Sequence, residues 1–126
     1  MKVWIQDDIQ KDLKICIKKG WKSLDKELTY VLRLLKIDGS MPGEDPFQYV
    51  KGELYGNTLH ARIALPSDGV GKSRGARIIY YRNEEEIKVL YVGGHKDRRY
   101  NNSSLICDLL LARFKSCQFQ EFKDPD

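Results

Sequence analysis

The sequence predicts a single α+β domain in which helices pack against a mainly antiparallel, twisted sheet of three to four strands. Apolar residues recur at helical spacing through the first 39 residues, alternate with a period of two between residues 58 and 92, and return to helical spacing from 103 to 116. The chain of 126 residues can build one hydrophobic core but not two. We therefore expect one domain over 1–126 that ends in a polar tail at 117–126.

The first 39 residues are expected to form a helical hairpin. Residues 1–5 are apolar enough for an edge strand, although they could equally lead into a helix. Apolar side chains then recur every three or four positions from 6 to 19 and from 24 to 35, and Gly20 separates the two runs. Ser23 is a candidate N-cap for the second helix. The shared apolar stripe predicts packing against a sheet, so we expect no chemistry there.

A long connection is predicted between the hairpin and the sheet. Residues 38–57 contain two prolines and four glycines, which is typical of a loop that crosses the surface. Phe47 and Tyr49 are among the side chains that could hold it against the domain. Because the connection is longer than a compact scaffold needs, it is a candidate functional loop or partner surface.

Three strands are predicted, at about 58–65, 76–82 and 86–92. In the first strand, apolar residues alternate with His60 and Arg62, so one face is apolar and the other presents a histidine beside an arginine. The last two strands are close enough in sequence to form a hairpin. The 58–92 region therefore supplies the sheet.

The predicted layering leaves one face of the sheet open. Ser103 or Ser104 can cap the final helix, whose apolar side is expected to join the core. With the helices on one face, the opposite face would be concave and basic.

The net charge of +4 is concentrated between residues 60 and 100. This stretch holds nine Lys or Arg against five Asp or Glu, whereas the rest of the chain is balanced at 13 against 13. Both histidines and four of the seven tyrosines lie in the same stretch. Such clustering is the electrostatic footprint of a protein that binds a polyanion, although a merely solvated basic face would give the same count.

Cysteine usage and hydropathy disfavour secreted, membrane and zinc-binding proteins. The three cysteines are an odd number without zinc-site spacing, which argues against a disulfide framework and a structural metal. No apolar run approaches the roughly 20 residues of a membrane span, and the first residues do not look like a signal peptide. We expect a cytoplasmic protein that needs no metal and no other cofactor.

A nucleoside-triphosphate site is also disfavoured. Gly71-Lys72-Ser73 matches the end of a P-loop, but Pro66 stands where that motif has its first glycine. The following residues read as a strand, so no helix N-terminus would face the phosphates.

Three segments together resemble the RelE/HigB-like toxins of bacterial toxin-antitoxin systems. Residues 71–81, GKSRGARIIYY, resemble the entry to the central strand of that family. Residues 59–63, LHARI, resemble the preceding strand, and residues 91–100, YVGGHKDRRY, resemble the closing segment. The element order agrees from about residue 24 to 114, whereas the 38–57 connection and the tail exceed the usual length of the family.

The resemblance implies an active site on the open face. It assigns Arg77 to the scissile phosphate, His95 to general acid or base catalysis, His60 to a second proton transfer, and Tyr100 to base stacking or phosphate binding. Histidines suit proton transfer near neutral pH, and an arginine fork suits a phosphate. Sequence-independent phosphate contacts would come from the remaining cations, which are Arg62, Lys72, Arg74, Lys96, Arg98 and Arg99.

The function implied is that of a metal-independent messenger-RNA endoribonuclease that acts on the ribosome. Its partners would be messenger RNA, the ribosome and a small antitoxin protein that covers the basic face, and a homodimer is possible. The alternatives are a non-enzymatic toxin or nucleic-acid- or gyrase-binding module of the related ParE-like branch, and a regulatory protein with a vestigial site. Arg77 could also be an ordinary strand arginine paired with a glutamate, and Tyr100 an ordinary packed aromatic.

Overall fold

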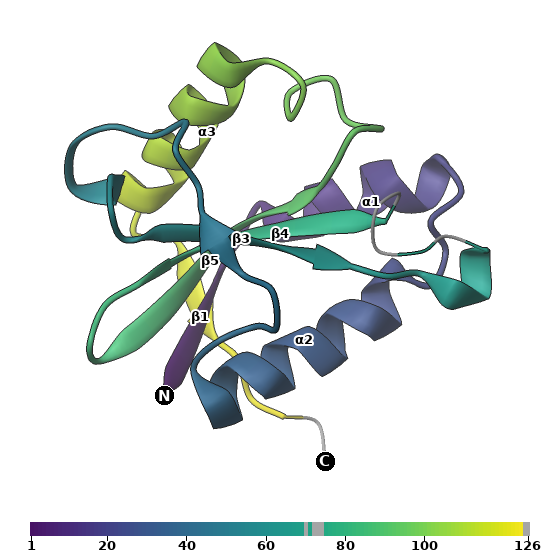
Figure 1. Ribbon diagram of the computed structural model, residues 1–126, viewed down its shortest axis with the longest axis horizontal. Helices are drawn as coiled ribbons and strands as arrows, with labels where there is room; N and C mark the ends of the chain where they lie inside the picture. The colour runs from purple at the N-terminus through teal and green to yellow at the C-terminus, as the bar shows by residue number, and fades with distance from the viewer. Residues whose placement is uncertain (70, 72–74, 125–126) are drawn as a thin grey trace.

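The computed structural model describes residues 1–69, 71 and 75–124 (Figure 1). Within these residues the fold is α+β, with three α-helices and a six-stranded, mostly antiparallel open sheet. The predicted fold class is confirmed, but the sheet has more strands than the three to four expected. The helices are α1 (Ile9–Lys18), α2 (Leu24–Asp38) and α3 (Ser103–Lys115).

The strand order of the sheet is β2-β3-β4-β5-β1-β6. The strands are β1 (Lys2–Gln6), β2 (Asp45–Pro46), β3 (Thr58–Ile63), β4 (Ala76–Arg82), β5 (Glu86–Gly93) and β6 (Phe119–Glu121). The three central strands agree with the predicted ones to within two residues. Between them, Arg62 is the partner of Arg77 across β3 and β4, and Arg77 is the partner of Gly93 across β4 and β5.

Two expectations about the ends of the sheet were wrong. β1 is an inner strand rather than an edge, because it pairs parallel with β5 on one side and antiparallel with β6 on the other. The tail contributes β6, and Phe122 beyond it is buried, so part of this segment is held by the core. Strand pairing between distant segments supplies the hydrogen bonds that the local sequence does not predict.

Both faces of the sheet carry packed structure, which corrects the expectation of one open face. Apolar residues of α1 and α2 pack on one face against side chains such as Ala61, Ile78 and Val89. On the opposite face, Ile106 and Leu110 of α3 join a second cluster with Ile79, Leu90, Tyr91 and residues of the 39–57 connection. Figure 1 shows α2 and α3 on opposite sides of the sheet. The basic region therefore lies beside α3 instead of across a whole bare face.

The helix ends follow their local chemistry with two differences from expectation. Asn102, and neither Ser103 nor Ser104, caps α3, because its side chain accepts from the amides of Ser104 and Leu105. Ser23 precedes α2 as predicted, but its hydroxyl donates to Asp68 at 2.6 Å instead of capping the helix. α2 therefore gains a tie to the segment that follows β3.

Candidate functional site

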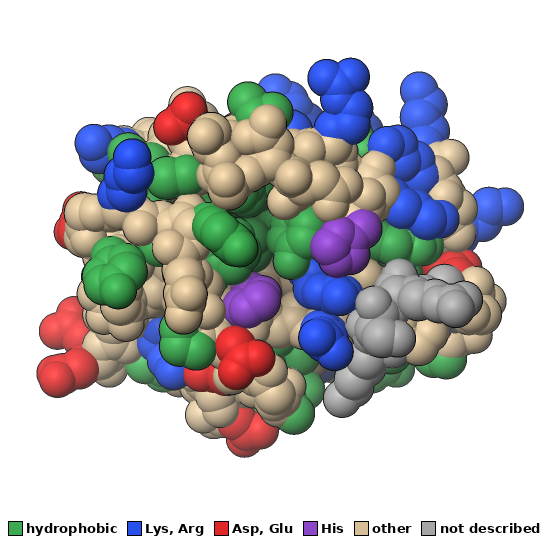
Figure 2. Space-filling view, turned by 45° about the horizontal axis from the view of Figure 1, so that its top comes forward, with side chains coloured by type: hydrophobic (Ala, Val, Ile, Leu, Met, Phe, Trp, Pro, Cys, Tyr) green, Lys and Arg blue, Asp and Glu red, His purple; other side chains and the backbone are tan. Residues whose placement is uncertain are grey.

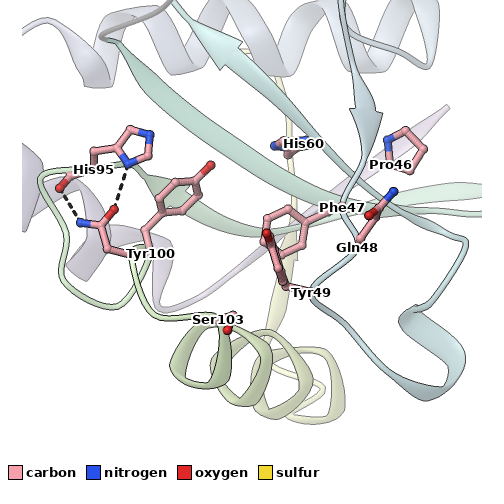
Figure 3. Close-up of a pocket in the computed structure, with 9 residues that line it drawn as sticks. Pro46, Phe47, Gln48, Tyr49, His60, His95, Tyr100 and Ser103 are labelled. Atoms are coloured by element: carbon pink, nitrogen blue, oxygen red, sulfur yellow. Dashed lines mark hydrogen bonds between the residues drawn. The ribbon is translucent and has the colours of Figure 1, made fainter.

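A hollow beside α3 contains both histidines. It has a volume of about 560 Å³, and it is bounded by the 46–49 part of the connection, by β3, by the 95–101 segment and by the start of α3 (Figure 3). Figure 2 shows both histidines at one hollowed face, with Lys and Arg side chains gathered beside them. We call this hollow the histidine pocket, and its lining residues are Pro46, Phe47, Gln48, Tyr49, His60, His95, Tyr100, Asn101 and Ser103.

The connection forms one wall of the histidine pocket, and it is anchored to the sheet. Glu44 accepts hydrogen bonds from the hydroxyl of Tyr80 and from Nη1 of Arg82, the latter at 2.8 Å. The amide of Phe47 donates to the carbonyl of Thr58 at 2.9 Å, and Phe47 is buried. These bonds fix the wall from two directions. The connection is therefore an ordered part of the domain.

Asn101 orients His95 at the opposite wall. Its Nδ2 donates to the backbone carbonyl of His95 at 2.8 Å, which places its Oδ1 toward Nδ1 of the imidazole at 2.9 Å. Because an amide oxygen only accepts, Nδ1 of His95 must carry the proton. Nε2 is then the ring nitrogen left for proton exchange with a ligand. Nothing in the local sequence predicts this pairing of Asn101 with His95.

Tyr100 links His95 to the rest of the site. Its ring meets the imidazole edge-on with centroids 5.3 Å apart, and it stacks on Tyr91 at 5.9 Å with an interplanar angle of 10°. Burial raises the pKa of Tyr100, while the charge of Arg77 and a hydrogen bond from it oppose that rise. His95 and Arg77 thus both contact Tyr100, which places them on the same side of the sheet.

Arg77 is buried rather than presented to solvent, which corrects the expectation of an exposed guanidinium. Only 6% of the residue is exposed, and Nη1 donates to the carbonyls of Gly75 and Ala76 at 2.9 and 3.2 Å. Arg77 is the second residue of β4, between its partners Arg62 on β3 and Gly93 on β5. Its positive charge still acts on the site, because it lowers the pKa of His60 and opposes the rise in the pKa of Tyr100. The role at the scissile phosphate stays a prediction.

His60 lies in a setting that favours the neutral imidazole. Desolvation lowers its pKa most, the charges of Arg77 and Arg62 lower it further, and Asp45 partly offsets them. The ring also packs edge-on against Phe47 with centroids 5.3 Å apart. Arg62, two positions further along β3, is exposed, although it is not among the residues that line the histidine pocket. His60 can therefore accept a proton at neutral pH beside an exposed guanidinium.

Arg99 belongs to a buried ionic cluster instead of the pocket. Its Nη2 lies 2.7 Å from Asp97 and 3.0 Å from Asp12, and Asp12 also receives two bonds from Arg113 at 2.6 and 2.9 Å. Asp12 is fully buried. We call these four residues the ionic cluster. Its two cations face two carboxylates, so Arg99 adds little free charge for a phosphate.

The ionic cluster also positions the pocket. Asp97 accepts from the hydroxyl of Tyr91 at 2.9 Å, and Tyr91 carries the ring on which Tyr100 stacks. Burial raises the pKa of Asp97, but the bonds from Arg99 and Tyr91 lower it more, so the net pKa is below its ordinary value. The 95–100 segment is therefore tied to α1 and α3 through charged side chains.

The remaining predicted cations have different surroundings. Lys96 is exposed, donates to the carbonyl of Lys19 at 2.8 Å and lies over the ring of Trp21. Arg98 is exposed. The predictions for Lys72 and Arg74 lie outside the described residues.

Within residues 1–69, 71 and 75–124, no group of three or more His, Cys, Asp or Glu side chains could hold a metal ion. None of the helices described is long and apolar enough to cross a membrane. Comparison with protein-family models, curated proteins and solved structures found no match.

Proposed function

We propose that this chain is a metal-independent endoribonuclease, a toxin of the RelE/HigB kind that cleaves messenger RNA on the ribosome and is restrained by a small antitoxin. The observation that carries the proposal is the joint presence of His60 and His95 in one open pocket. Proton-transfer groups near neutrality, with cations at the rim, are what RNA cleavage without a metal needs. The order of helices and strands, and the residues quoted for the resemblance, support the same reading.

The roles follow from the surroundings of each imidazole. His60, favoured as the neutral form, takes the proton of the 2′-hydroxyl, and the 2′-oxygen attacks the adjacent phosphorus. The bond from phosphorus to the 5′-oxygen breaks, and protonated His95 gives its Nε2 proton to that oxygen. The products are a 2′,3′-cyclic phosphate and a 5′-hydroxyl. Both products form without an added water molecule.

Cations stabilise the dianionic phosphorane in this scheme. Arg62 is exposed beside His60 and can make direct bonds to phosphate oxygens. Arg77 contributes its charge from beneath and holds Tyr100. Arg62→Ala is the cleaner test of phosphate binding, because replacing Arg77 would also remove buried bonds.

The test is cleavage of RNA by the purified chain with ribosomes, with and without a chelator. We expect chelator-resistant cleavage that ends in cyclic phosphate. His60→Ala and His95→Ala should each lower the rate by about 10²–10⁴-fold. Loss of cleavage in the chelator, or full activity in both variants, would contradict the proposal.

A second candidate is a nucleic-acid-binding module that does not cut. The burial of Arg77 favours it, because the guanidinium assigned to the scissile phosphate is not open to a ligand. This candidate predicts salt-dependent RNA binding by the wild-type chain without cleavage products. The same incubation therefore separates the two candidates.

A further inference from the structure

The walls of the histidine pocket are aromatic on both sides. Phe47 and Tyr49 stand on the connection with ring centroids 5.6 Å apart, and His95 and Tyr100 stand across the hollow (Figure 3). Tyr49 is 61% exposed, so most of its ring is available to a ligand. Planar rings on two sides of a hollow suit a planar aromatic group that stacks between or upon them.

The polar groups of the histidine pocket suit a neutral heterocycle beside a negative charge. Gln48 and Ser103 supply amide and hydroxyl groups that can donate and accept. None of the nine described residues that line the pocket carries a carboxylate. The volume of about 560 Å³ lies in the range of about 300–1,000 Å³ that is usual for small-molecule sites. An anionic ligand with an aromatic part therefore meets no negatively charged side chain on these walls.

We infer that the histidine pocket holds one unpaired nucleobase of a single-stranded RNA, stacked on Tyr49 at the wall formed by the connection. The inference rests on the proposed function for the choice of RNA. Base stacking on an aromatic side chain needs an exposed base face, which a duplex covers. The 39–57 connection thereby becomes the element that selects single strands, and the imidazoles act on the phosphodiester next to the bound base.

Rigidity of the wall strengthens this inference. Phe47 is 6% exposed and packs edge-on against His60, and Glu44 is bonded to Tyr80 and Arg82 a few residues earlier. A ring held on such a support loses little conformational entropy when a base stacks on it. The pocket is therefore formed before the ligand arrives.

The test compares two tyrosines of the same connection. Tyr49 lines the histidine pocket, whereas Tyr55 is 67% exposed and does not line it. The probes are a short single-stranded oligoadenylate with 2′-O-methyl groups, which block cleavage, and an abasic ribose-phosphate strand of equal length. Tyr49→Ala should weaken binding of the oligoadenylate by about 5- to 150-fold and leave the abasic strand unchanged. Tyr55→Ala should change neither, and thermal unfolding should be the same for all three proteins.

Equal affinity of the wild-type chain for both strands would overturn the inference, as would equal losses in the two variants. Failure of the nuclease proposal looks different. If unmodified RNA is not cut while Tyr49→Ala still causes a base-dependent loss of binding, the base-binding pocket is supported and the nuclease proposal is refuted. If RNA is cut equally well by the wild type and by Tyr49→Ala, the nuclease proposal is supported and the base-binding pocket is refuted.

Discussion

The ionic cluster and the histidine pocket are neighbours built partly from the same segment, yet they differ in charge and exposure. In the ionic cluster, Arg99 and Arg113 face two carboxylates, and Asp12 is fully buried. In the histidine pocket, no carboxylate lines the described walls, and the imidazoles of His60 and His95 border open space. Basic residues in one stretch of sequence can therefore either hold the fold or meet a ligand. The presence of an acidic partner decides between the two.

The largest effect is expected from breaking the ionic cluster. Asp12→Ala leaves Arg113 and Arg99 without their shared carboxylate, and removing one partner of a buried pair costs about 3–5 kcal/mol. Denaturant unfolding measures the loss. Asp7→Ala, an exposed change just before α1, should stay within about 0.5 kcal/mol. Similar stability of the two variants would show that the cluster is not structural.

The next effect concerns the pocket and should leave stability intact. Asn101→Ala removes the bond to Nδ1 of the His95 imidazole and the bond to the His95 backbone carbonyl, and loss of orientation should slow RNA cleavage by about 10–100-fold. Asn102→Ala is the matched control, because it removes the cap of α3 and should cost about 1 kcal/mol of stability without changing the rate. A normal cleavage rate in Asn101→Ala, together with a slower rate in Asn102→Ala, would show that Asn101 does not act in the active site.

A smaller effect is expected where the connection is anchored. Glu44→Gln weakens its bonds to Arg82 and Tyr80, and a partly exposed charged hydrogen bond of this kind contributes about 1–2 kcal/mol. Glu53 is exposed on the same connection, so Glu53→Gln should leave the free energy of unfolding unchanged. Urea unfolding of both variants provides the comparison. An unchanged free energy of unfolding in Glu44→Gln would mean that the wall does not depend on these bonds.

The smallest effect is a pH dependence that marks the pocket. The pKa of His60 is lowered in the folded chain, chiefly by desolvation, so the unfolded chain binds its proton first as pH falls. The free energy of unfolding should therefore rise with pH from the lowered folded pKa up to about 6.5. His60→Gln should remove this part of the pH dependence in urea titrations. Parallel curves for the two proteins would mean that His60 is not desolvated.

Local patterns predicted those parts of the fold that depend on short-range chemistry. The period of two gave β3, β4 and β5 to within two residues, and helical spacing gave α2 up to Gly39, whose positive φ of 73° ends the helix. β6 was missed because three residues pair with β1 only after the whole sheet has formed. The cover that α3 places on the second face also depends on tertiary packing.

The candidate site was predictable in its residue types and not in their partners. His60 and His95 were selected for their chemistry, and the structure places both at one pocket. Arg99 was assigned to phosphate because Asp12 lies 87 positions away in sequence and gives no local signal. Arg77 alternates correctly along its strand, but periodicity says which face a side chain takes and not what lies above it. The contact of Asn101 with His95 likewise has no local signal in the sequence.

The parallel pairing of β1 with β5 has a consequence for how the protein is made. β1 ends at residue 6 but must wait for its parallel partners at 86–89, and Asp12 must wait for Arg99 and Arg113. During synthesis β1 and the Asp12 carboxylate lack these native partners until residues 86–89 and 99 have been added to the chain. Assembly of the two ends of the chain is then a late event in folding, and the pocket walls that depend on the ionic cluster are completed only after it.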